Sequence, residues 1–191
     1  MTQDIALFFE GDDYYREAFK AIAAAQAEIC LETYIFALDE IGVEFLQRLA
    51  SAQKRGVAVY LLVDGVGSNT SLPALRQFCE QNEIHLRVYH PVPFLNFGPL
   101  QQPRVELRLY IALLRRINSR NHRKVIIVDR IVAFAGSLNI ISVHSRKFSG
   151  EKAWRDTGMR IESPKAAIVE LRNSFFRAWR RAFRWSRLLT R

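Results

Sequence analysis

Apolar and polar positions along the chain follow two different periods, which predict helices and strands in turn. Segments with apolar residues at helical spacing are separated by short runs rich in β-branched and aromatic residues. The helices are predicted over residues 12–26, 41–55 and 72–82, and the strands over 28–36, 57–63 and 84–89. Three such helix–strand units predict a layered α/β fold with a mixed, mostly parallel sheet flanked by helices. A length of 191 residues predicts one domain, 1–191.

The second half of the chain predicts a β-hairpin, one more strand and a long helix. Val125–Val128 and Ile131–Ala135 are short apolar runs, and the polar pair Asp129-Arg130 between them predicts a tight turn. A strand is predicted over 153–162, and a final amphipathic helix is predicted to begin after Ser163.

Candidate chemistry gathers around this hairpin. Side chains alternate between the two faces of a strand, so we expect His122 and Lys124 to point the same way. Ser137 and Asn139, also two residues apart, can converge just past the second strand. A nucleophile beside a cation and neutral donors suits attack on a phosphodiester, because charge develops on the non-bridging oxygens.

These residues stand in the pattern HxKxxxxD…GSxN, formed by His122, Lys124, Asp129, Gly136, Ser137 and Asn139. The pattern resembles the signature of the phospholipase D superfamily. The segments Leu31–Phe36 and Arg55–Ser68 are similar to the N-terminal catalytic half of bacterial cardiolipin synthases. The resemblance covers roughly residues 10–180 and implies a phospholipase D-like fold.

The resemblance also implies roles for single residues. It places His122, Lys124, Asp129 and Asp156 among the catalytic residues, with a phosphohistidine forming on His122. Lys124, Ser137 and Asn139 would hold the substrate phosphate, and Asp156 would accept a hydrogen bond from the second nitrogen of His122. Since Asp129 has the wrong strand parity to share the face of His122, we expect it to bind backbone or neighbouring cations instead of substrate. No metal or other cofactor is expected.

The family uses two such motifs in one active site, whereas this sequence contains a single His-x-Lys, at His122-Arg-Lys124. The first hypothesis is a phosphatidyltransferase of the cardiolipin synthase type. Its second motif would come from a partner protomer in a homodimer or from a C-terminal half. One alternative is a homodimeric, metal-independent phosphodiesterase that acts on nucleic acid. The other is a catalytically silent remnant that binds anionic lipid.

The charge of the chain favours polyanionic partners. Lys and Arg number 28 against 19 Asp and Glu, giving a net charge of +9 at pH 7. The basic, apolar segment Arg104–Lys124 is the best candidate for a contact with anionic phospholipid such as phosphatidylglycerol. Neither a signal peptide nor a membrane-spanning run is expected. These features predict a peripheral membrane protein at the cytoplasmic face of the bacterial inner membrane.

Several other polar or reactive residues are expected to serve the fold alone. His144 is predicted to be a surface residue, because no partner pattern surrounds it. Cys30 and Cys79 lack metal-type spacing and are predicted to be reduced core thiols. The turn Asp64–Ser68 lacks the Gly-Lys-Ser/Thr of a P-loop, so an ordinary turn is favoured over a phosphate cradle.

Overall fold

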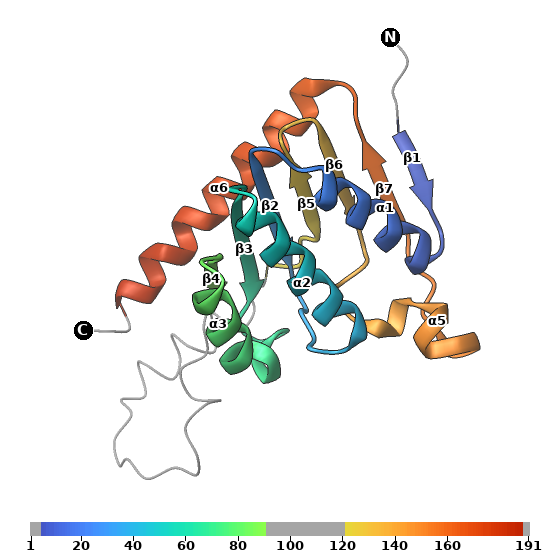
Figure 1. Ribbon diagram of the computed structural model, residues 1–191, viewed down its shortest axis with the longest axis horizontal. Coiled ribbons are helices and arrows are strands. Elements are labelled where there is room, and N and C mark those ends of the chain that lie inside the picture. The colour runs from blue at the N-terminus through green and yellow to red at the C-terminus, as the bar shows by residue number, and fades with distance from the viewer. Residues whose placement is uncertain (1–4, 91–120, 189–191) are drawn as a thin grey trace.

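The computed structural model describes residues 5–90 and 121–188, in which a seven-stranded sheet lies between two layers of helix (Figure 1). The strands are β1 (Ile5–Phe8), β2 (Glu28–Thr33), β3 (Ala58–Asp64), β4 (His85–Tyr89), β5 (Val125–Val128), β6 (Val132–Gly136) and β7 (Gly158–Ile161). The α-helices are α1 (Gly11–Ala24), α2 (Glu40–Lys54), α3 (Leu72–Gln81), α5 (Arg146–Ser149) and α6 (Lys165–Leu188). Short 3-10 turns cover Asn69–Ser71, Ser142–His144 and Gly150–Lys152.

The strand order is β1-β7-β6-β5-β2-β3-β4. The layered α/β class is confirmed, but the expectation of a mostly parallel sheet is wrong. Only β2–β3 and β3–β4 are parallel among the described pairs, whereas β2–β5, β5–β6, β6–β7 and β1–β7 are antiparallel. The helix–strand units make the parallel half, and the later strands add to β2 as an antiparallel meander.

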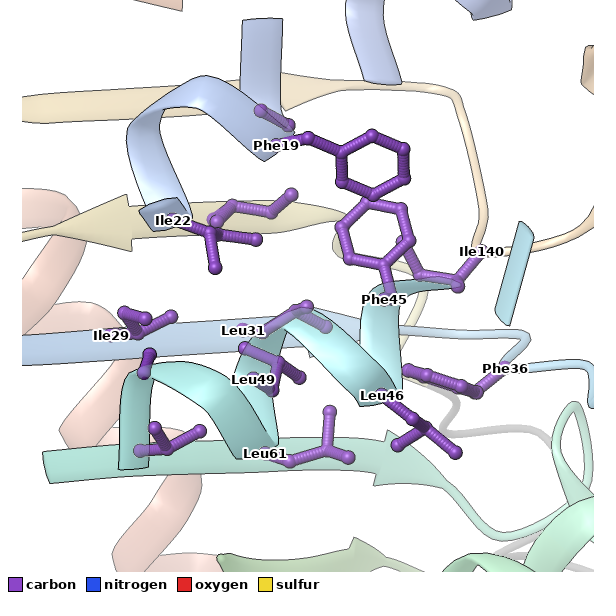
Figure 2. Packing of buried hydrophobic residues seen from close by; sticks show 14 of the residues in the cluster. Phe19, Ile22, Ile29, Leu31, Phe36, Phe45, Leu46, Leu49, Leu61 and Ile140 are labelled. Carbon is purple, nitrogen blue, oxygen red and sulfur yellow. The ribbon is translucent and has the colours of Figure 1, made fainter. Parts of the chain in front are cut away.

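Each face of the sheet builds its own hydrophobic core. On one face, α1 and α2 cover alternate residues of β2 and β3, and Figure 2 shows Leu46 and Leu49 of α2 packed over Leu31 and Leu61. On the other face, Phe175 and its neighbours on α6 pack against the intervening strand residues. Because both faces are covered, β2 and β5 are buried along their whole length.

Helix α6 is also fixed to the sheet by ion pairs. Arg172 binds both carboxylate oxygens of Glu28 at the start of β2, and Arg130 binds one of them at 3.0 Å. Burial opposes ionisation of Glu28, but hydrogen bonds from Arg172 and Arg130 outweigh it and lower the pKa of this carboxyl group. These bonds hold the helix across the strands. The buried residues of α6, which we call its inward stripe, pack against the core: Ile168, Phe175, Trp179 and Ala182.

Two further differences from the predictions have simple causes. Strand β1 was not predicted, and it pairs only with β7 at the edge of the sheet. The strand predicted over 153–162 is reduced to β7, because its partner β6 ends at Gly136, opposite Gly158. Most of the basic segment Arg104–Lys124 lies outside the described residues. In the described part of the chain, no helix is both long and apolar enough to cross a bilayer.

Candidate phosphodiester site

The sheet topology brings five separate segments of the chain to one edge. Strands β2 and β3 are parallel, so both end at this edge. Strand β5 runs antiparallel to β2 and therefore begins there, with Val125 opposite Glu32. In turn β6 ends there and β7 begins there, since Val125 pairs with Ala135 and Gly136 with Gly158. The residues just outside these strand ends are therefore neighbours, although the sequence separates them widely.

At this edge the imidazole of His122 is exposed and lies flat against the ring of Tyr34, which follows β2. The two ring centroids are 4.2 Å apart and the planes are inclined by 19°. Lys124 Nζ donates a hydrogen bond to the backbone oxygen of His122 over 2.8 Å, and it lies 5.7 Å from the Tyr34 centroid. One aromatic ring thus holds both the imidazole and the ammonium group.

Two buried carboxylates anchor the segment that carries these groups. Asn121 donates its side-chain N–H to Glu32 and its backbone N–H to Asp64. Arg123 lies 3.4 Å from the second oxygen of Glu32. Burial raises the pKa of Glu32, while Arg123 and Asn121 act against that rise. The chain on both sides of His122 is therefore tied to the ends of β2 and β3.

Tyr34 is itself held in place by the turn after β3. Asp64 accepts hydrogen bonds from the backbone N–H groups of Val66 and Gly67, which closes the turn on its own carboxylate. Ser68 Oγ donates to the backbone oxygen of Tyr34 over 3.1 Å. A Cβ atom on Gly67 would lie 2.3 Å from that same oxygen, so only glycine permits this approach. The segment Asp64–Ser68 is therefore a turn that holds the backbone of Tyr34 in place.

Ser137 and Asn139 lie just beyond β6 and are bound mainly to backbone. Ser137 Oγ donates to the backbone oxygen of Thr157 over 3.3 Å and accepts from its N–H over 3.1 Å. Asn139 Oδ1 accepts from the backbone N–H of Ile35 over 3.1 Å. The buried hydroxyl of Tyr15 donates to the backbone oxygen of Asn139. With Oδ1 engaged in this way, the amide N–H₂ of Asn139 is the end left to donate to an anion.

Asp129 lies at the opposite end of β5 from His122. It stands in the β5–β6 turn with φ +53°, and its carboxylate accepts from the backbone N–H groups of Gln26, Ala27 and Glu28, each over 2.8 Å. A four-residue strand is about 13 Å long at roughly 3.3 Å per residue, so this carboxylate is remote from the imidazole. The expectation that Asp129 binds backbone is confirmed. The structure does not bring it to the other motif residues.

Asp156 is placed in the loop that leads into β7, next to the Thr157 that binds Ser137. Its Oδ2 atom lies 3.0 Å from Nδ1 of His144. The prediction that His144 is a surface residue is wrong, because its side chain is 1% exposed. The cause is the packing of loop 142–156 against the start of α1, where a Cβ on Gly11 would collide with the backbone oxygen of His144.

Electrostatics link Asp156 to Lys124. Burial lowers the pKa of Lys124, and the negative charge of Asp156 acts in the opposite direction. Burial also lowers the pKa of His144, with Asp156 opposing and Lys124 reinforcing that change. Lys124, Asp156 and His144 therefore lie within range of one another's fields at the same sheet edge.

The geometry offers an exposed ring nitrogen, an ammonium group and an amide donor for a bound phosphate. Within residues 5–90 and 121–188, no group of three or more His, Cys, Asp or Glu side chains is placed to hold a metal ion. Lys124 and neutral donors at this edge can stabilise charge that develops on a bound phosphate.

Four residues of this site were missed in the sequence: Tyr34, Glu32, Asp64 and His144. The sequence could have identified Glu32 and Asp64, because a carboxylate inside or at the end of an almost wholly apolar strand needs a polar partner. No feature of the sequence identified Tyr34 or His144. The role of Tyr34 depends on its contact with His122, about ninety residues along the chain, and that of His144 depends on loop packing against α1.

Comparison with known proteins identifies the family of the chain. Residues 19–179 match the family model described as "Cardiolipin synthase, PLD-like domain". Cardiolipin synthase B of Salmonella typhi is 33% identical over 165 residues, which cover 86% of this chain and 36% of that protein. A cardiolipin synthase of Clostridium perfringens is 33% identical over 181 residues, which cover 92% of this chain and 33% of that protein. The chain thus spans about a third of the length of these relatives.

A solved structure shares the fold as well. The phospholipase D family member Nuc of Salmonella typhimurium superposes with a TM-score of 0.66 at 18% identity, over 94% of this chain and 96% of that one. The likeness at this identity concerns the fold, and the match of residues 19–179 concerns the family. The chain belongs to the PLD-like domain family of the cardiolipin synthases.

Proposed function

We propose that this chain supplies one half-site of a phosphatidyltransferase that acts through a covalent phosphohistidine on His122. The observation that carries the proposal is the exposed His122 ring, fixed on Tyr34 with the Lys124 ammonium beside it. The neutral form of an imidazole carries an in-plane lone pair that can attack phosphorus. Stacking on Tyr34 restrains rotation of the ring.

In the first step a nitrogen of His122 attacks phosphorus, the bond from phosphorus to the leaving alcohol oxygen breaks, and that oxygen takes a proton. Lys124 and the amide of Asn139 stabilise the non-bridging oxygens as negative charge develops on them. In the second step the hydroxyl oxygen of an acceptor lipid attacks phosphorus, the bond from phosphorus to His122 breaks, and the hydroxyl proton passes to the group that protonated the leaving alcohol in the first step. With phosphatidylglycerol as donor and acceptor, the products are cardiolipin and glycerol.

The proton donor for the leaving alcohol is assigned to a second His-x-Lys motif. The chain has four histidines, and only His122 stands in such a pattern. The second motif would come from a second copy of this chain or from further sequence. If two copies build one site, the rate per molecule rises with protein concentration until the dimer is complete.

The lipid substrate is supported by the character of α6. Its inward stripe packs on the sheet, whereas Arg177, Arg180 and Arg181 face outward. A hollow of about 360 Å³ on this helix is lined by Arg172, Asn173, Phe176, Arg177 and Arg180. Basic side chains near an anionic leaflet each contribute on the order of 1 kcal/mol to membrane binding. We assign this face to the anionic, cytoplasmic surface of the bacterial inner membrane.

The test measures transfer and cleavage side by side in EDTA. The purified chain is mixed with phosphatidylglycerol vesicles, and cardiolipin is quantified by mass spectrometry; a parallel sample receives DNA. We expect cardiolipin from the wild type, none from His122→Ala, and wild-type amounts from His85→Ala. His85 is the matched control, because it is an exposed histidine on β4 that stacks on Tyr60. DNA cleavage without lipid turnover would instead support the nuclease alternative, and unchanged turnover in His122→Ala would end the catalytic assignment.

A further inference from the structure

His144 is a buried histidine with a single polar neighbour. Its side chain is 1% exposed, and Nδ1 lies 3.0 Å from Asp156 Oδ2. This approach is an ion-pair contact without hydrogen-bond geometry, and neither ring nitrogen has a hydrogen-bond partner in the part of the chain that the structure describes. A polar group is costly to bury without a partner, so the contact with the Asp156 carboxylate is what makes this position suitable for histidine rather than an apolar residue.

The loop around His144 is firmly attached to the body of the domain. Ser145 Oγ donates a hydrogen bond to Asp12 in the first turn of α1. The backbone N–H of Trp154 donates to the oxygen of Val143 over 2.8 Å, and the Trp154 ring stands edge-on to His144 at 6.0 Å. The position of the His144 ring is therefore fixed, so the ring can restrain the Asp156 side chain.

Asp156, in contrast, reaches the surface at the phosphodiester site. Its side chain is 26% exposed, and its neighbour Thr157 binds Ser137 through both backbone groups. Its charge acts on Lys124. One oxygen of Asp156 points to His144, so the other remains for a partner in the site. Without a fixed donor, a carboxylate of this exposure would turn toward water.

We propose that His144 is a positioning residue that holds Oδ2 of Asp156 and so presents its other oxygen to Lys124 and to the nucleophile His122. The inference rests on the proposed function, because it concerns the same site. It includes no covalent step by His144 and requires the ring proton to be on Nδ1. Burial lowers the pKa of His144, so the ring is neutral at pH 7 and leaves the full charge of Asp156 available to the site.

The test uses a nearly isosteric pair of variants. His144→Asn keeps an N–H close to the place of Nδ1, whereas His144→Leu has almost the same shape and no donor. Hydrolysis of bis(p-nitrophenyl) phosphate is measured with each, and thermal melts confirm that each is folded. We expect His144→Leu to lower kcat by about ten- to a hundredfold with KM within about twofold, and His144→Asn to restore most of the loss.

A second pair of variants asks whether His144 acts through Asp156. In an Asp156→Asn background, His144→Leu should cause no further loss, because the carboxylate that it positions is already absent. Equal losses in His144→Leu and His144→Asn, or full additivity with Asp156→Asn, would show that the ring serves packing alone and would overturn the proposal.

One measurement separates failure of this inference from failure of the proposed function. The pKa of the Lys124 amine is followed by NMR in the free protein, without any substrate. We expect it to fall in His144→Leu, to fall further in Asp156→Asn because the charge itself is removed there, and to recover in His144→Asn. If no variant or wild type turns over substrate but the Lys124 pKa follows this order, the catalytic proposal fails and the positioning role stands. A Lys124 pKa that is unchanged in His144→Leu would refute the positioning role whether or not the chain is active.

Discussion

The sharpest structural prediction concerns Asp129, the acidic member of the motif. Its carboxylate accepts three backbone hydrogen bonds at the junction of α1 and β2, from Gln26, Ala27 and Glu28. It also occupies a left-handed backbone conformation, with φ +53°. Asp129→Ala removes the acceptors and places alanine in a conformation that it adopts poorly, so we expect loss of stability with retention of catalysis per folded molecule.

The magnitude follows from the exposure of each N–H group. The Glu28 N–H is part-buried, and a lost bond from such a group to a charged acceptor costs about 1.5–3 kcal/mol. The other two are exposed, so water replaces most of what they lose, and together they add roughly 0.5–1 kcal/mol. The left-handed backbone adds about 1 kcal/mol for alanine. The sum is about 3–5 kcal/mol, equivalent to a fall in Tm of roughly 6–20 °C for a domain of this size.

Asp129→Asn is the matched control. Asparagine tolerates the left-handed conformation and keeps Oδ1, which serves Ala27 and Glu28, but it loses the acceptor for Gln26. We expect a loss of about 1 kcal/mol. Urea unfolding gives the free energies, and turnover is divided by the folded fraction. If Asp129→Ala were as stable as the wild type but as inactive as His122→Ala, the structural role of Asp129 would be refuted and a catalytic role supported.

The remaining predictions concern stability against pH and the aromatic support. Arg172 and Arg130 lower the pKa of Glu28, so its stabilising effect exists above the ordinary carboxyl pKa of about 4.3 and is lost as pH falls below it. In thermal melts recorded at different pH values, Glu28→Gln should reduce the fall in Tm below this pH. Burial raises the pKa of Glu32, so stability should decline as pH rises above about 4.3, and Glu32→Gln should remove that decline. Tyr34→Leu should lower kcat about tenfold and Tyr34→Phe only slightly, because the ring and not the hydroxyl supports His122; equal losses would contradict stacking.

Local signals predicted the elements that hold the site. The hairpin around Asp129 appears within one residue of its predicted bounds, since β-branched runs and a polar turn are local features. The inward stripe of α6 is confirmed, with Ile168, Phe175 and Ala182 buried. Cys30 and Cys79 are buried free thiols, as their spacing predicted.

Long-range pairing was the part that the sequence did not reveal. Nothing local determines that β5 adds to β2 in the antiparallel sense, so the share of parallel strands was overestimated. The burial of His144 depends on a loop that packs against α1, and the stacking of His122 on Tyr34 depends on two strands meeting at one edge. Such contacts follow from topology, which residue periodicity does not specify.

The most direct test of the central claim is to trap the covalent intermediate. The chain is mixed with phosphatidylglycerol vesicles in EDTA, quenched in base to preserve phosphohistidine, digested and examined by mass spectrometry. We predict a phosphatidyl group on the peptide that carries His122, absent from His122→Ala and present in His85→Ala. Substrate turnover with no adduct on His122, or an adduct on another residue, would contradict the account.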